Sequence, residues 1–136
     1  MTRIKHVIGS SPCVVFNLPS TKAGDNSILK GKVFIDIYGL KCSQSLSFAK
    51  EELVRLSSEA KQLYDNLKGT VTIQSECKSF WFSVSASSTG NIKIEVTMTR
   101  YEFSQPNNSE WQAYGSFYNY PECLLPLIEI GNEVKG

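Results

Sequence analysis

Hydrophobic and polar positions alternate along most of this chain, and one long stretch with helical spacing interrupts the alternation. Residues 32–38 and 91–100 place apolar side chains at every second position, which is the period of a strand with one buried face. Further strands are predicted at 11–18, 70–74, 79–85 and 111–118. The residues expected on the inner face of the sheet are Val33, Ile35, Ile37, Ile92, Ile94, Val96 and Met98. Short connections between successive strands favour antiparallel pairing.

Residues 47–68 predict an amphipathic helix. Its apolar stripe consists of Leu53, Leu56, Ala60, Leu63 and Leu67, which recur at helical spacing. We expect Ser47 to cap the start of this helix, and Lys68 with Gly69 to end it in a basic last turn and a left-handed residue. The stripe is the pattern of a helix that packs on a sheet.

A second, shorter helix is predicted at 121–130, with Gly131 at its end. Pro126 lacks a backbone N–H, so it marks either a kink or the true start of this helix. Together the elements predict a single α+β domain over residues 1–136. We expect an antiparallel sheet of about six strands, with two helices packed on one face.

The composition is that of a globular protein, with 41% hydrophobic and 20% charged residues. A formal net charge of +1, without a polybasic block, argues against binding to a phosphate backbone. No apolar run reaches the roughly 18 residues of a membrane-spanning helix. The basic N-terminus lacks the apolar core of a secretory signal, so we expect a cytoplasmic protein.

Few residues of this chain could carry chemistry. Four cysteines occur without a CxxC pair and are expected to be reduced and mostly buried: Cys13, Cys42, Cys77 and Cys123. The single histidine, His6, lies in a polar N-terminal stretch that we expect to be mobile. Glu51 and Glu52 are adjacent and do not share a helix face, so they form no carboxylate pair. We therefore expect no catalytic residue, no metal site and no cofactor.

Five aromatic residues share the strand parity opposite to the predicted core face: Phe34, Tyr38, Trp81, Tyr114 and Tyr118. If they cluster, the outer face of the sheet carries an aromatic patch of the kind that protein interfaces enrich. A β-bulge, or an N-terminal segment laid over them, would bury them instead. The same patch could stack single-stranded bases, although no RNA-binding signature accompanies it.

The order of elements resembles the WapI-type family of bacterial immunity proteins, which are small cytosolic antidotes to toxins delivered between neighbouring cells. The resemblance covers about residues 30–134. It rests on the helix that closes on Leu67-Lys68-Gly69, the turn Gly90-Asn91-Ile92, a strand ending near Phe117, and the helix start Cys123-Leu124-Leu125-Pro126-Leu127-Ile128.

The resemblance implies a protein that binds the C-terminal domain of one cognate contact-delivered (polymorphic) toxin, expected to be a nuclease, and occludes its active site. From the charge balance and the lack of a long apolar run, we expect no direct contact with nucleic acid or membrane. The partner-binding residues that we expect are Asp36, Tyr38, Trp81, Glu95, Tyr114 and Tyr118. A competing surface is the exposed face of the first helix, through Glu52, Glu59 and Lys61. Two other classes stay open: a nucleic-acid-binding sheet domain, and a small enzyme or ligand-binding protein.

Overall fold

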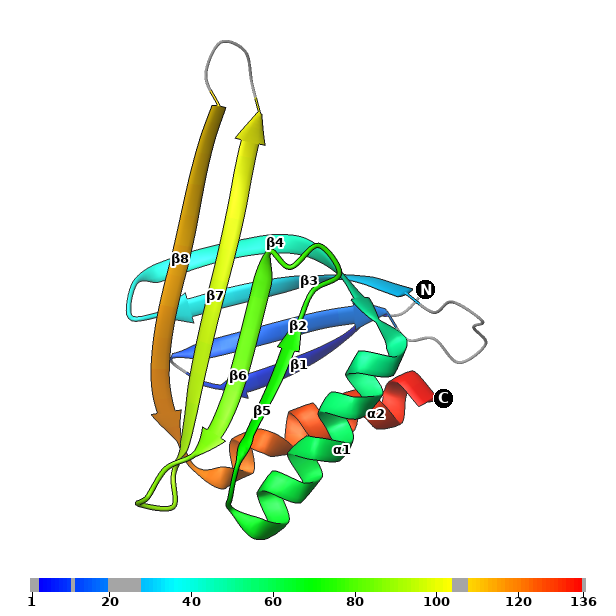
Figure 1. Ribbon diagram of the computed structural model, residues 1–136, viewed down its shortest axis with the longest axis vertical. Helices are drawn as coiled ribbons and strands as arrows, with labels where there is room; N and C mark the ends of the chain where they lie inside the picture. Colours follow the sequence, from blue (N-terminus) through cyan, green and yellow to red (C-terminus); the bar gives the residue numbers. More distant parts are fainter. Residues whose placement is uncertain (1–2, 11, 20–27, 104–107, 136) are drawn as a thin grey trace.

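The computed structural model has two four-stranded antiparallel sheets and two helices (Figure 1). It describes residues 3–10, 12–19, 28–103 and 108–135. Sheet A contains, in spatial order, β1 (Arg3–Gly9), β2 (Cys13–Pro19), β3 (Ile28–Ile37) and β4 (Leu40–Ala49). Sheet B contains β5 (Thr70–Gln74), β6 (Phe80–Ala86), β7 (Ile92–Phe103) and β8 (Asn108–Asn119). Helix α1 (Lys50–Asn66) joins the two sheets, and a 3₁₀ turn, η1 (Pro121–Leu124), leads into α2 (Leu125–Lys135).

The α+β class is confirmed, whereas the single sheet of about six strands is wrong. The sequence pattern did not predict two of the eight strands, β1 and β4, because polar residues occupy inward-facing positions in them. His6 is buried beside Ile8 in β1, and Gln44 lies between Cys42 and Leu46 on the inner side of β4. A polar side chain at such a position breaks the apolar alternation by which a half-buried strand is recognised.

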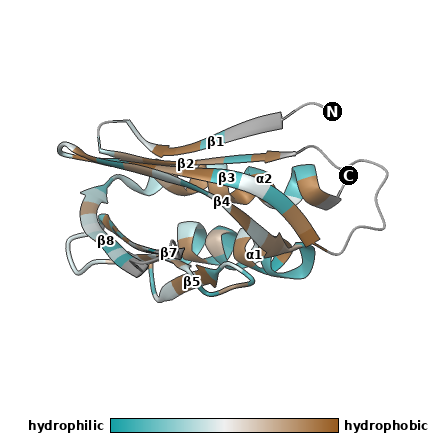
Figure 2. Cartoon of the chain, turned by 90° about the horizontal axis from the view of Figure 1, so that it is seen from above, coloured by the Kyte–Doolittle hydropathy of each residue, from teal (hydrophilic) through white to brown (hydrophobic). Residues whose placement is uncertain are grey.

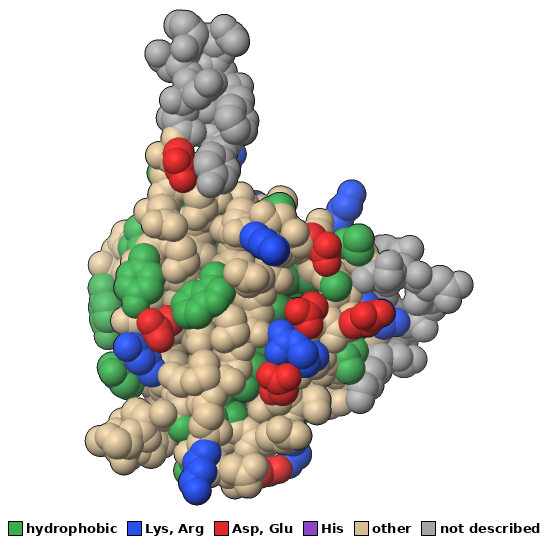
Figure 3. Space-filling view, in the orientation of Figure 1, with side chains coloured by type: hydrophobic (Ala, Val, Ile, Leu, Met, Phe, Trp, Pro, Cys, Tyr) green, Lys and Arg blue, Asp and Glu red, His purple; other side chains and the backbone are tan. Residues whose placement is uncertain are grey.

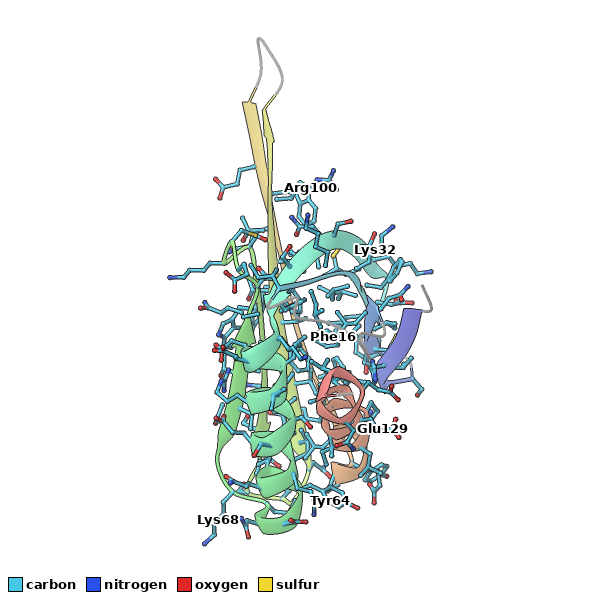
Figure 4. All side chains as sticks on the ribbon, turned by 90° about the vertical axis from the view of Figure 1, so that its right-hand side faces the viewer. Phe16, Lys32, Tyr64, Lys68, Arg100 and Glu129 are labelled. Atoms are coloured by element: carbon cyan, nitrogen blue, oxygen red, sulfur yellow. The ribbon has the colours of Figure 1, made fainter. Side chains whose placement is uncertain are left out.

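The two sheets form two layers, with the strands of one running across those of the other and the helices filling the space between them on one side (Figures 1 and 2). Four phenylalanines with no exposed surface join the layers: Phe16, Phe48, Phe80 and Phe82. The Phe16 ring of β2 meets the Phe82 ring of β6 edge-on, with 5.3 Å between the ring centroids. Figure 4 shows Phe16 in the interior between the layers. The predicted inner-face residues are all buried, at 8% exposure or less, which confirms their assignment.

Helix α1 starts three residues later than predicted. Ser47 belongs to β4, where its carbonyl oxygen accepts a hydrogen bond from the backbone N–H of Glu76, so it is not the cap. The helix ends at Leu67, which has a positive φ of 52° and donates its N–H to the carbonyl oxygen of Leu63. Lys68 lies outside the helix, and the last turn contains no basic residue. Four members of the predicted stripe, Leu53, Leu56, Ala60 and Leu63, are buried as expected, whereas Leu67 is 41% exposed at the helix end.

Helix α2 crosses α1 at a glycine. A Cβ atom on Gly131 would lie 2.2 Å from Cβ of Ser57, so only a glycine allows this approach. The Ser57 hydroxyl donates a hydrogen bond to the carbonyl oxygen of Ile128 at the same crossing. Gly131 therefore lies within α2 rather than at its end, which corrects the predicted boundary. Pro126 stands in the first turn of α2, which confirms it as a marker of the helix start. No helix among the described residues is long and apolar enough to cross a membrane.

The packing of α1 generates the first prediction. Leu63 is 2% exposed, so replacing it with alanine should lower the free energy of unfolding by about 2–5 kcal/mol through lost burial and a residual cavity. Urea unfolding followed by circular dichroism measures this change. Gln62→Ala, on the exposed side of the same turn, is the matched control and should change stability by less than about 0.5 kcal/mol. A similarly small effect of Leu63→Ala would contradict the packing described here.

Candidate functional site

The predicted aromatic patch divides between the two sheets. Trp81, Tyr114 and Tyr118 lie on strands of sheet B, whereas Phe34 lies on β3 of sheet A, so the five aromatic residues do not gather in one patch. Strand parity indicates which side of its own sheet a residue faces, and it does not indicate which sheet the strand joins. Asp36 also lies on β3, so the structure separates it from most of the predicted partner-binding residues.

The outer face of sheet B brings four of these residues together: Trp81, Glu95, Tyr114 and Tyr118. Trp81 of β6 pairs with Thr97 of β7, and Thr97 pairs in turn with Tyr114 of β8. The two aromatic side chains thus flank a small residue in one row across the sheet. The Tyr114 hydroxyl donates a hydrogen bond of 2.9 Å to the carboxylate of Glu95. Figure 3 shows hydrophobic side chains gathered on this face, over the β7–β8 side of the sheet.

The tyrosines of this face are open to solvent. Tyr114 is 57% exposed and Tyr118 is 60% exposed. The register between β7 and β8 runs without interruption from Ile92 to Phe103, so no bulge turns these side chains inward. The N-terminal strand β1 pairs with β2 in the other sheet. Among the described residues, neither a β-bulge nor a covering N-terminal segment buries the tyrosines.

Tyr38 belongs to the other sheet and lies near Tyr118 at a corner of the molecule. It occupies the two-residue turn between β3 and β4 with a positive φ of 47°, followed by Gly39 at 94°, as in a type I′ hairpin. Its side chain is 82% exposed. A hollow of about 350 Å³ at this corner is lined by Ser10, Pro12, Tyr38, Asn91, Tyr118, Asn119 and Tyr120. Sequence reasoning missed Tyr120, which is 71% exposed, because it follows the last strand and has no strand parity.

Asp36 lies on the outer face of sheet A in a different environment. It is half-buried and pairs across the sheet with Cys13 on one side and Lys41 on the other. With Phe34, which is 40% exposed, it lines a mainly apolar hollow of about 450 Å³. The ammonium group of Lys32 lies 5.2 Å from the centre of the Phe34 ring. This face is therefore separate from the one that carries Trp81.

The competing surface on α1 has charges that are already paired within the helix. The Arg55 guanidinium contacts the carboxylates of Glu52 at 2.7 Å and Glu59 at 2.9 Å, and the hydrogen bond to Glu52 raises the pKa of Arg55. Lys61 contacts Asp65 at 2.8 Å. A partner that docked here would have to compete with these pairs, whereas Trp81 and Tyr114 offer uncharged surface.

His6 is not mobile, which corrects the expectation from the sequence. It lies in β1 with only 4% of its surface exposed. Neither ring nitrogen has a hydrogen-bond partner among the described residues. Burial lowers the pKa of His6, and the charges of Glu129 and Glu133 on α2 oppose this shift (Glu129 is labelled in Figure 4). A neutral, enclosed imidazole of this kind is not available as a general base for a substrate.

The cysteines form no shared site. All four are free, and only Cys123 is buried, so the expectation that they are mostly buried is wrong. Cys77 is exposed, and its hydrogen bond with the Ser79 hydroxyl lowers the pKa of the Cys77 thiol. In the described part of the chain, no three His, Cys, Asp or Glu side chains lie together as a metal ion would require.

Comparisons with protein-family models, with curated proteins and with solved structures found no match for this chain.

The burial of His6 predicts how stability depends on pH. In the unfolded chain the imidazole takes up a proton near its ordinary pKa of 6.5, whereas the lowered pKa of the folded state keeps it neutral. The unfolded state thus binds more protons, so stability should fall as the pH is lowered from about 7.5 to about 5.5.

Thermal unfolding at several pH values tests this prediction. His6 is the only histidine, so His6→Phe should flatten the dependence in this range. If the stability of His6→Phe depends on pH as that of the wild type does, the dependence comes from other titratable groups.

Proposed function

We propose that this protein is an inhibitor that acts by binding another protein, as an immunity protein against the C-terminal domain of a contact-delivered bacterial toxin. The outer face of sheet B is the proposed docking surface. One observation carries the proposal: an exposed tyrosine and a tryptophan flank a small residue on a rigid antiparallel sheet, and the tyrosine is hydrogen-bonded to a carboxylate. The cognate toxin is proposed from the sequence resemblance alone.

The chemistry of this surface suits protein binding. Trp and Tyr bury much area with few rotatable bonds and keep a polar group for hydrogen bonding, and they dominate the binding energy of many interfaces. Glu95 offers a carboxylate beside Tyr114 that can pair with one cation of the partner. The hydrogen bond from Tyr114 holds this carboxylate in place before the partner arrives, which reduces the entropy lost on binding.

Occlusion requires no reacting group on the inhibitor, and this agrees with the site chemistry. His6 is enclosed, and Cys77 lies on the turn between β5 and β6, where its thiol contacts only the hydroxyls of Ser75 and Ser79 among the described side chains. We therefore propose binding rather than catalysis. A nucleic-acid-binding role would call for several cations beside the aromatic rings, whereas Lys93 is next to Glu95 on this face and offsets its charge.

One observation favours a second candidate, the binding of a small ligand. The hollow at the corner has a volume of about 350 Å³ and is lined by three tyrosines with two asparagines. Cavities that hold small molecules begin at roughly this size, although they usually enclose the ligand more deeply. Loss of toxin protection in Trp81→Ala, with protection kept in Tyr120→Ala, would separate protein docking from this alternative.

The genetic neighbourhood gives the first test of the proposal. An upstream reading frame that encodes a large secreted protein with a variable C-terminal domain is expected, and a metabolic operon would count against the proposal. Co-expression of this chain with that C-terminal domain should restore the growth that the domain alone prevents.

The docking surface is tested by one substitution on each competing face. Trp81→Ala should weaken binding to the upstream C-terminal domain by about 2 kcal/mol or more, because a central aromatic anchor is lost. Lys61→Ala, on the exposed face of α1, should leave affinity unchanged and serves as the control. Isothermal titration calorimetry measures both, with circular dichroism to verify folding. The reverse pattern would move the docking surface to α1.

A further inference from the structure

Strand β8 has an open edge. It is the last strand of sheet B and, at 12 residues, is longer than β5 or β6. Thr99 of β7 donates its N–H to the carbonyl oxygen of Ser79, so the backbone polar groups of Thr99 point toward β6. Because neighbouring residues of an antiparallel strand bond to opposite sides, Gln112, which pairs with Thr99, turns its own groups away from β7.

The unbroken register extends this pattern along the strand. The backbone N–H and C=O groups of Gln112, Tyr114, Ser116 and Tyr118 all face outward at the edge. Within the described residues, none of these groups takes part in a hydrogen bond with a turn, a side chain or another strand. The edge therefore offers a row of donors and acceptors about 20 Å long.

Two other edge strands, β5 and β4, make contacts that β8 lacks among the described residues. At the edge of β5 in sheet B, the Arg55 guanidinium donates a 2.7 Å hydrogen bond to the carbonyl oxygen of Thr72, and α1 lies alongside. At the edge of β4 in sheet A, Ser47 accepts a hydrogen bond from Glu76. Proteins commonly protect an edge with lysine, proline, a bulge or a covering segment. The sequence of β8 contains no lysine or proline, and Glu110 is its only charged residue.

The β3–β4 turn, residues 38–40, projects beneath this edge and is called the shelf below. Gly115 of β8 lets the side chain of Ile37 approach so closely that a Cβ atom at residue 115 would be 2.6 Å from it. The β3–β4 hairpin therefore crosses β8 on its inner side, and its turn extends beyond the strand in both views of the chain (Figures 1 and 2). Tyr38 is 82% exposed and Leu40 is 38% exposed on this extension, so the shelf is largely apolar and uncovered.

We infer that β8 is a strand-addition site, at which an extended segment of the partner protein pairs with the sheet as a ninth strand. This inference rests on the proposed function and specifies how the partner docks. Side chains of the added strand would alternate between two surroundings. Those on the inner side would rest on Tyr38 and Leu40, so they are expected to be apolar, and those on the outer side would extend the surface formed by Tyr114 and Trp81.

The occupant follows from continuity with the proposed docking face. Tyr114 and Tyr118 turn their backbone groups toward the open edge and their exposed side chains toward the outer face of sheet B. One partner can therefore cover the face and pair with the edge at the same time, so we assign the edge to an extended segment of that partner.

Amide hydrogen exchange, followed residue by residue by NMR, tests this inference. In the free protein the amides of Gln112, Tyr114, Ser116 and Tyr118 should exchange quickly, whereas those of Ala113 and Phe117, bonded to β7, should exchange slowly. On addition of the purified upstream C-terminal domain, the four fast amides should slow by about tenfold or more, because backbone bonds to the partner protect them.

A proline variant provides the second measurement. Ser116→Pro removes an outward N–H without breaking a bond to β7, so the protein should fold and yet lose affinity for the domain about tenfold or more. Ser116→Ala keeps the N–H and should bind as the wild type does. If the complex forms while the four amides stay fast and Ser116→Pro binds normally, strand addition is wrong and the proposed function stands.

Two further outcomes would overturn the inference. If no complex forms with the wild-type protein, the proposed function fails and the docking mode fails with it. If the four amides are already slow in the free protein, and become faster on dilution, a second copy occupies the edge instead of the partner.

Discussion

The fold depends on the contact between the two sheets through their phenylalanines. Each sheet has only four strands and could not bury a core alone, so the apolar inner faces of the two sheets pack against each other. Phe16 and Phe48 of sheet A meet Phe80 and Phe82 of sheet B edge-on, with centroid separations of 5.3–6.0 Å. The helices then close the side on which the layers leave room, and two glycines allow the closest approaches: Gly131 between the helices and Gly115 between the sheets.

The packing of the two sheets and the helices determines which surfaces stay exposed and can bind a partner. Because every apolar strand face is used inside, the residues of the outer faces carry no packing duty, and Trp81, Tyr114 and Glu95 can be arranged for a partner. The strands that carry them are paired on both sides or, for β8, on one side, so the platform is rigid before binding. The crossing at Gly115 also sends the turn with Tyr38 past the edge of β8. The proposed docking face, the open edge and the shelf therefore follow from a single packing arrangement.

Much of the fold could be predicted from local patterns, and the rest could not. The alternation in β7 and the stripe of α1 are strong because nearly every inward position is apolar. β1 and β4 were missed because His6 and Gln44 occupy inward positions, and Ser47 was mistaken for a helix cap because serine suits both a cap and an edge strand. Gly131 looked like a helix end because glycine usually terminates helices, whereas here it makes room for Ser57.

The candidate site was predicted in part for a similar reason. Parity placed Trp81, Glu95, Tyr114 and Tyr118 on an outer face, and the structure brings them together. Parity could not separate Asp36 from them, since the pairing of strands into two sheets is decided by contacts distant in sequence. The open edge of β8 is invisible to sequence patterns for the same reason, because it depends on which strand is last.

The central claim is that a protein partner covers the outer face of sheet B. Covalent labelling of tyrosine and tryptophan side chains, compared by mass spectrometry in the free protein and in its complex with the upstream C-terminal domain, tests it most directly. Trp81, Tyr114 and Tyr118 should lose reactivity in the complex, while Tyr64 on α1 keeps its own. Unchanged reactivity of Trp81 and Tyr114, with protection of Tyr64, would contradict the account and assign the interface to the helix.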